Sequence, residues 1–345
     1  MQGKVDEQQS NDIEAEFGYY PVEVNVETDD FSLLTLPGLA EKTNLINNHR
    51  NVINGWIYPG NQEVYNLNGG ISTMPFSQRV FGLPKTHSLK LKNTSSLETL
   101  NFAVWCLSFF KGIRLTTTDA GFLDATPIKP SKLTDFILVK CSEKEVIELA
   151  LKYMSSETKT KHAPINIAAI VHALFLSQNP QYLSFEKFQY LYMALDSCFA
   201  LTWAEKNKCT EKTLNHSRRL KWICKTYGIP RPSWVTGKKN ITNIRNENFH
   251  EAMFHGQPLG FTTINNYQYG DDILQQMQAL ICRLLVAILG VNAPDYITSN
   301  VNSREYHSLT LKNIKRLKIL SSNNKYWRCI ITKTNKKITT NALLR

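Results

Sequence analysis

The spacing of apolar residues changes near residue 141, and this change limits the folds open to the chain more than any other feature. Before it, apolar and polar residues alternate in short runs, the period of a half-buried β-strand. The strand candidates are 22–27, 52–58, 88–92 and a buried run at 136–140. After it, apolar residues recur with the period of a helix. The sequence therefore predicts an α+β protein in which a β-rich N-terminal domain is followed by an all-α helical bundle.

Capping residues place the expected helices. Ser95 or Ser96 precedes a helix over 96–110, and Ser142 with Glu145 forms a capping box that starts a helix reaching about residue 154. The remaining helices are expected near 164–177, 184–206, 211–227, 243–254 and 271–289, the last closed by Gly290.

A chain of 345 residues is long enough for two domains at about 100–200 residues each. Residues 1–17 are polar and acidic, and we predict that they are disordered. The domains that follow are predicted as a β-rich sensor or regulatory domain (18–141), a helical bundle (142–295) and a basic tail with a short strand at 326–331 (296–345).

Positive charge is concentrated at the C-terminus. Residues 301–345 hold eleven Lys or Arg against one acid, a net +10 out of +11 for the whole chain. Such a segment attracts polyanions such as RNA, and Lys315 and Arg316 are its candidate contacts, although a solvated tail explains the charge equally well. Arg218 and Arg219 are further candidate RNA-binding residues beside Trp222. A charged helix face around one core Trp is the more conservative interpretation there.

Composition excludes several classes of protein. No apolar run is long enough to span a membrane, and the polar, acidic start does not resemble a secretory signal. Seven widely spaced cysteines without a CxxC pair suit free thiols in a reducing cytoplasm and argue against a structural zinc site. Phosphate-loop, dinucleotide, zinc-protease and α/β-hydrolase motifs are missing. We therefore expect a cytoplasmic protein with no metal, no cofactor and no membrane partner.

The segment Ile244–Pro258 (IRNENFHEAMFHGQP) gathers Arg245, Asn246 and His250. Arg presents a fixed cationic fork to a phosphate, His exchanges protons near neutral pH, and Asn offers a neutral donor and acceptor. Together they are suited to RNA cleavage through the ribose 2′-OH. An ideal helix, however, separates residues i and i+5 by about 140°. We therefore expect Arg245 and His250 to converge only through a distorted helix start or a second subunit.

This segment resembles the Arg-x(4–6)-His signature of the HEPN superfamily, with a polar residue after the Arg and the acid Glu251 after the His. The order of helices over about 145–290, behind a β-rich domain, is similar to that of bacterial ApeA-type HEPN proteins. The resemblance implies a metal-independent endoribonuclease and a homodimer with a composite active site. In that site Arg245, His250 and Asn246 carry catalysis. Relatives often act as toxins or in abortive anti-phage defence. The family often continues His-Glu-Gly, whereas this chain has Ala252.

Other interpretations stay open. His250 is equally consistent with an ordinary helix histidine, and Asp196 with either a solvent-facing acid or a group supporting the motif. The HEPN domain is alternatively a non-catalytic dimerisation or RNA-binding module, and a third possibility is nucleic-acid binding through the basic tail alone. A ribonuclease in the cytoplasm would need restraint, so the N-terminal domain is expected to sense a phage-derived or nucleotide trigger.

Overall fold

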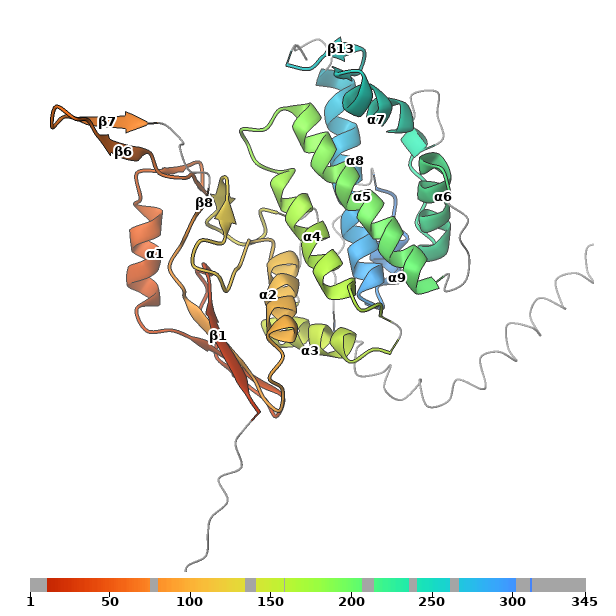
Figure 1. The fold of residues 1–345 in the computed structure, drawn as a ribbon. Helices are drawn as coiled ribbons and strands as arrows, with labels where there is room; N and C mark the ends of the chain where they lie inside the picture. Colours follow the sequence, from red (N-terminus) through yellow and green to blue (C-terminus); the bar gives the residue numbers. More distant parts are fainter. Residues whose placement is uncertain are drawn as a thin grey trace, which may run out of the picture.

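The computed structural model describes residues 11–74, 80–133, 141–157, 159–206, 214–235, 241–260, 267–301 and 311. The predicted strands at 136–140 and 326–331, together with Lys315 and Arg316, lie outside these residues. The α+β architecture is confirmed, with most of the strands before residue 128 and the two longest helices after residue 141 (Figure 1).

A four-stranded antiparallel sheet in the order β1-β9-β3-β2 forms the base of the N-terminal half. Its strands are β1 (Ile13–Phe17), β2 (Val26–Glu27), β3 (Phe31–Thr35) and β9 (His87–Leu91). The strand predicted at 88–92 is thus confirmed, whereas only Val26 and Glu27 of the run at 22–27 form a strand.

The prediction of disorder over residues 1–17 is wrong for its last five residues. Ile13, Ala15 and Phe17 lie on the more buried side of β1, and two glutamates point the other way. Each residue of β1 pairs with β9. The two glutamates made this stretch look like a polar tail, although the alternation itself is that of a strand with one buried face.

The strand expected over 52–58 is a hairpin. Asn54 and Gly55 both have positive φ, 52° and 79°, the backbone of a two-residue type I′ turn. They join β4 (Val52–Ile53) to β5 (Trp56–Ile57), and β11 (Thr126–Pro127) pairs with β5. The remaining elements of this half are α1 (Leu39–Asn47), β6 (Gln62–Tyr65), β7 (Ile71–Met74), β8 (Val80–Phe81) and β10 (Phe122–Leu123).

Both predicted helix starts near the centre of the chain are confirmed. Helix α2 (Leu97–Lys111) begins after Ser96, whose hydroxyl accepts a hydrogen bond from the Thr99 amide. Helix α3 (Glu143–Met154) begins with the capping box of Ser142 and Glu145. Each cap satisfies amides that the first helical turn leaves without a partner.

The C-terminal half is a bundle around α5 (Ser184–Lys206), which contacts α4, α6, α7 and α8 (Figure 1). The helix predicted over 184–206 is confirmed as α5, and its side chains Phe188, Leu191, Leu195 and Cys198 are buried. The other helices are α4 (Ala163–Leu176), α6 (His216–Tyr227), α7 (Ile241–His250), α8 (Tyr267–Ile288) and α9 (Pro294–Ile297).

The buried core is continuous across the boundary predicted between residues 141 and 142. Helix α2 packs on α3 and α4 of the C-terminal half and also contacts β1 and β9. Polar groups cross the same boundary: Lys111 pairs with Glu143 at 2.9 Å, and Glu143 accepts a hydrogen bond from the Tyr20 hydroxyl at 2.7 Å. The two halves therefore share one interior.

None of the helices in the part of the chain that the structure describes is long and apolar enough to cross a membrane.

Candidate functional site

The candidate site lies at the outer end of the bundle, on α7. This helix is anchored by the buried side chains of Ile241, Ile244 and Asn248. It ends at His250, four residues before the predicted end at 254. Ala252, His255 and Gly256 take positive φ, and β12 (Met253–Phe254) and β13 (Gln257–Pro258) form a tight hairpin. His255 therefore lies in the hairpin turn and not on the last turn of a helix.

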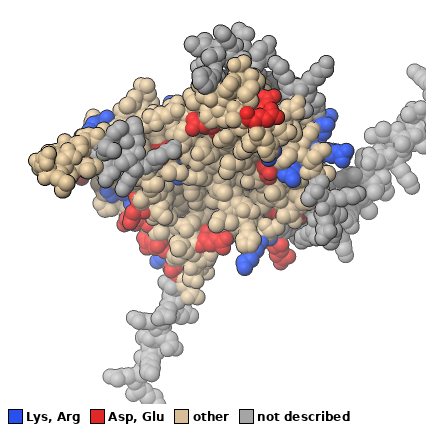
Figure 2. All heavy atoms as spheres, turned by 45° about the horizontal axis from the view of Figure 1, so that its top comes forward, with Lys and Arg blue, Asp and Glu red and all other residues tan. Residues whose placement is uncertain are grey.

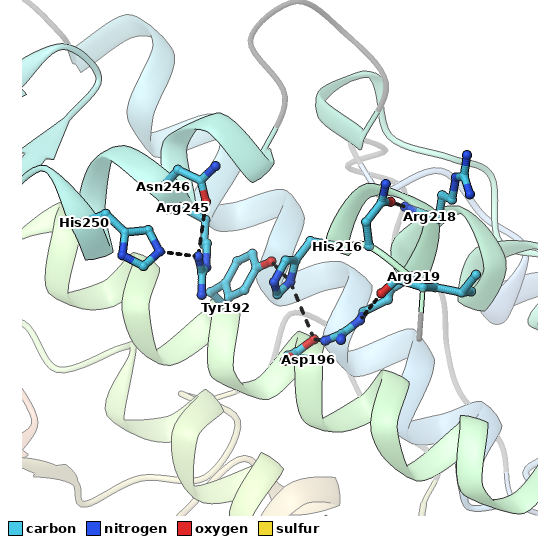
Figure 3. A network of polar contacts seen from close by, with 10 residues as sticks. Tyr192, Asp196, His216, Arg218, Arg219, Arg245, Asn246 and His250 are labelled. Carbon is cyan, nitrogen blue, oxygen red and sulfur yellow. Dashed lines mark hydrogen bonds and ion pairs between the residues drawn. The ribbon is translucent and has the colours of Figure 1, made fainter. Parts of the chain in front are cut away.

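Arg245 and His250 are in direct contact. The Arg245 Nη1 atom lies 2.8 Å from the His250 Nε2 atom, within one helix of one chain (Figure 3). The expectation that one helix would hold them apart is wrong because it considered only directions around the helix axis. The long Arg side chain instead extends past Phe249, with its guanidinium carbon 5.4 Å from that ring, to the exposed histidine at the helix end.

The contact gives the two side chains different hydrogen-bonding roles. A guanidinium has only donors, so Nε2 of His250 accepts from Arg245. A neutral imidazole is able to accept a proton from a substrate hydroxyl once Arg245 turns toward a phosphate. Asn246 supports this geometry, since its side-chain oxygen accepts from the same Arg245 Nη1 atom at 3.1 Å.

Arg245 also carries an unpaired donor. Its Nε atom is buried and has no hydrogen-bond partner among the described residues, although the side chain as a whole is only half-buried. Buried donors without a partner are rare and costly in proteins. The side chain therefore gains a hydrogen bond if it turns so that Nε reaches a ligand oxygen.

A second row of polar side chains continues from Arg245 toward α6 (Figure 3). The Tyr192 hydroxyl lies 2.8 Å from His216 Nδ1, and Asp196 pairs with Arg219 at 2.8 Å and lies 4.0 Å from His216. Burial lowers the pKa of His216, and the nearby Arg219 and Arg245 lower it further while Asp196 opposes them. The charged form of His216 is thus disfavoured beside Arg245.

Sequence reasoning missed Tyr192 and His216. Tyr192 and Asp196 stand one turn apart on α5, and His216 is the first residue of α6. No motif connects these positions along the chain. The sequence left open whether Asp196 faces solvent or supports the motif. In the structure it has two partners, Arg219 and His216, and it supports that end of the row.

The four predicted RNA-binding residues have different outcomes. Arg218 is exposed on α6. Arg219 is committed to the protein: it donates to Asp196 and to the Leu214 carbonyl, and it stacks over Phe199 at 5.3 Å. Trp222 packs against Trp203 and Phe199 with ring centroids 4.9 and 5.6 Å apart, as the conservative interpretation expected. Lys315 and Arg316 lie outside the described residues.

Helix α7 is held to α5 by one buried amide contact. Gln189 Nε2 donates to the side-chain oxygen of Asn248 at 2.8 Å, and Asn248 is 4% exposed. Asn248 therefore fixes the rotation of α7 and, with it, the direction in which Arg245 extends.

Among the described residues, no three His, Cys, Asp or Glu side chains gather as a metal site would require. The five described cysteines are buried, and burial raises the pKa of the Cys224 thiol to about 11. None of them has the low-pKa, accessible environment of a reactive thiol.

Comparison of the chain with protein-family models, curated proteins and solved structures found no match.

Proposed function

We propose that this protein is a metal-independent endoribonuclease in which Arg245 and His250 carry the reaction. The observation behind the proposal is the 2.8 Å contact between Arg245 Nη1 and His250 Nε2 at the exposed end of α7. It brings a fixed cation and a proton acceptor to one accessible point, which is what attack of a ribose 2′-OH on the adjacent phosphate requires.

The proposed reaction is a transphosphorylation. His250 removes the proton of the 2′-OH, the 2′ oxygen forms a bond to phosphorus, and the bond from phosphorus to the 5′ oxygen breaks. The products are a 2′,3′-cyclic phosphate and a 5′-OH end, so no water, metal or oxidant is consumed. Arg245 stabilises the charge that grows on the phosphate oxygens, and Asn246 holds the guanidinium in place.

The leaving 5′ oxygen needs a proton, and His250 is able to supply it after it has taken the proton of the 2′-OH. In the composite site of a homodimer, which the resemblance to HEPN proteins leads us to propose, His250 of a second copy is the alternative donor. Phe249, 43% exposed beside Arg245, offers apolar surface for such a contact.

The proposal also includes a biological role, that of a toxin-like effector in the cytoplasm that takes part in bacterial anti-phage defence. The N-terminal half would restrain the nuclease and would be the place where a trigger acts. The shared interior affects how this is tested. Deleting residues 1–141 would remove α2 and expose the faces of α3 and α4 that it covers. Activity should therefore be compared in the intact chain, with and without phage infection or added nucleotides.

The decisive experiment incubates the full-length chain with labelled single-stranded and structured RNA in EDTA, alongside His250→Ala and His255→Ala. His255 is the matched control because it lies five residues away in the hairpin turn. We expect wild type and His255→Ala to leave 2′,3′-cyclic phosphate ends, and His250→Ala to cleave at least about 100-fold more slowly. Equal cleavage by all three would contradict the assignment of the site. A lack of cleavage in every RNA and in infected cells would favour a non-catalytic module.

A further inference from the structure

A basic groove lies along α6, on the side of the molecule away from the N-terminal half. It has a volume of about 670 Å³ and is lined by Arg218, Lys221, Trp222, Lys225 and Arg231, together with four apolar or backbone positions. No acidic residue is among those that line it. We refer to these five residues as the α6 groove.

The helix itself arranges these cations. Arg218, Lys221 and Lys225 are spaced three and four residues apart, so they share one face of α6. They extend about 10 Å along its axis at 1.5 Å per residue. Arg231 reaches the same groove from the segment after Gly228, which ends the helix in a left-handed conformation at φ 69°. Figure 2 shows Lys and Arg gathered at the right-hand edge, the side on which α6 lies in Figure 1.

The described residues around these cations do not neutralise them. None of the four forms an ion pair with another described residue, in contrast to the adjacent Arg219, which is paired with Asp196. Like charges on one helix face repel each other and destabilise the helix. A face that carries them without compensating acids is therefore suited to an external polyanion.

The aromatic residue of the α6 groove, Trp222, indicates which kind of polyanion the groove suits. One side of the Trp222 ring packs edge-on against Trp203 and Phe199, which fixes its orientation, and the residue remains half-buried in the groove wall. Cations that follow a backbone, beside a held aromatic ring, are the combination that binds single-stranded nucleic acid. A flat membrane surface would not enter a concave groove.

We infer that the α6 groove binds the phosphate backbone of single-stranded RNA and directs the strand toward Arg245 and His250. The inference rests on the proposed function for the choice of RNA, and it assigns Lys225 and Arg231 a role that the sequence did not indicate. The row of Tyr192, His216 and Asp196 leads from the first residue of α6, the helix that carries the groove, toward the Arg245 and His250 pair (Figure 3).

The test measures binding and not cleavage. Fluorescein-labelled oligouridine is titrated with the full chain carrying His250→Ala, in EDTA, at several salt concentrations, and anisotropy reports the dissociation constant. The test variant adds Lys221→Glu and Lys225→Glu. The matched control adds Lys129→Glu and Lys132→Glu, which change net charge equally at two exposed lysines of the N-terminal half.

We expect the α6 variant to bind about tenfold more weakly than the control variant. We also expect the slope of log affinity against log salt to fall by about 1.4, or 0.7 for each lost phosphate contact with a single strand. Equal weakening in both variants, unchanged binding in the α6 variant, or no binding by the parent chain would overturn the inference. Thermal melts establish that each variant is folded. If the α6 variant with its two Glu substitutions unfolds, a variant with Lys221→Gln and Lys225→Gln takes its place.

The outcomes separate this inference from the proposed function. RNA binding that depends on the α6 groove, without cleavage by the wild-type chain, would retain the groove and contradict the nuclease. Cleavage that depends on His250, with binding unaffected by Lys221 and Lys225, would retain the nuclease and contradict the groove.

Discussion

Among the residues that the structure describes, two Arg–His pairs have the same chemistry and opposite surroundings. In one, Arg114 Nη2 lies 3.0 Å from His172 Nδ1 where the N-terminal half meets α4. In the other, Arg245 Nη1 lies 2.8 Å from His250 Nε2 at the outer end of α7. Arg114 is 6% exposed, whereas His250 is exposed and Arg245 half-buried.

Surroundings therefore separate the roles of the two pairs. Arg114 also donates to the Leu123 carbonyl, and the neighbouring Asp124 accepts from the Tyr182 hydroxyl, so the inner pair is enclosed in a network that joins the two halves. Burial lowers the pKa of Arg114 to about 10 and the pKa of His172 to about 4. The inner pair holds structure together, whereas a substrate is able to reach the outer pair.

The largest expected effect comes from removing each arginine in turn. Arg114→Ala leaves His172 and the Leu123 carbonyl without a donor inside the protein, and we expect it to lower the free energy of unfolding by about 3 kcal/mol. Arg245→Ala should cost less than about 1 kcal/mol, because its partners are exposed. Urea denaturation of both variants measures the difference. Similar losses in the two variants would remove the distinction between the pairs.

Acid should affect the inner pair first. His172 has a pKa of about 4 in the folded chain and about 6.5 when unfolded, and the fully buried His87 is shifted in the same way. Between these values the unfolded chain binds more protons, so stability present above pH 6.5 is lost as the pH falls toward 4. Each histidine contributes at most about 1.4 kcal/mol per pH unit, and solvent around the half-buried His172 reduces its share.

The measurement is the free energy of unfolding at pH 7, 6 and 5 for wild type, His172→Ala and His250→Ala. We expect a shallower pH dependence in His172→Ala than in the other two proteins. The prediction would be contradicted if His250→Ala made the pH dependence shallower and His172→Ala left it unchanged. The acid sensitivity would then belong to the outer pair.

The smallest effect on stability is expected for Asn246→Ala, which tests what holds Arg245 in the outer pair. Asn246→Ala removes the side-chain oxygen that orients Arg245, but Asn246 is exposed, so stability should change by less than about 0.5 kcal/mol. We expect RNA cleavage to fall by about tenfold, the cost of a mispositioned cation. Asn243→Ala, another exposed residue of α7, serves as the control. Unchanged cleavage in Asn246→Ala would show that Arg245 is held by His250 and Phe249 alone.

Local signals in the sequence were enough for much of the fold. The capping box at Ser142 and the cap at Ser96 correctly placed two helix starts, and the helix predicted over 184–206 matches α5. Two errors have local causes: the turn at Asn54 and Gly55 was taken for strand interior, and the glutamates of β1 concealed a strand that β9 completes.

The candidate site was only partly predictable. The residue types at 245, 246 and 250 indicated the chemistry, but their contact depends on the length of the Arg side chain and on a helix that ends at His250. The contributions of Tyr192, His216 and Gln189 arise from the packing of α5 against α6 and α7. Tertiary packing of this kind leaves no pattern in one sequence.

One paired measurement tests the central claim most directly: the melting temperature and the rate of RNA cleavage in EDTA for His172→Ala and His250→Ala, assayed below both melting temperatures. The account predicts that His172→Ala melts lower and still cleaves at close to the wild-type rate. It predicts that His250→Ala melts like wild type and cleaves at least about 100-fold more slowly. Wild-type cleavage by His250→Ala would contradict the claim that the exposed Arg245 and His250 pair performs the chemistry.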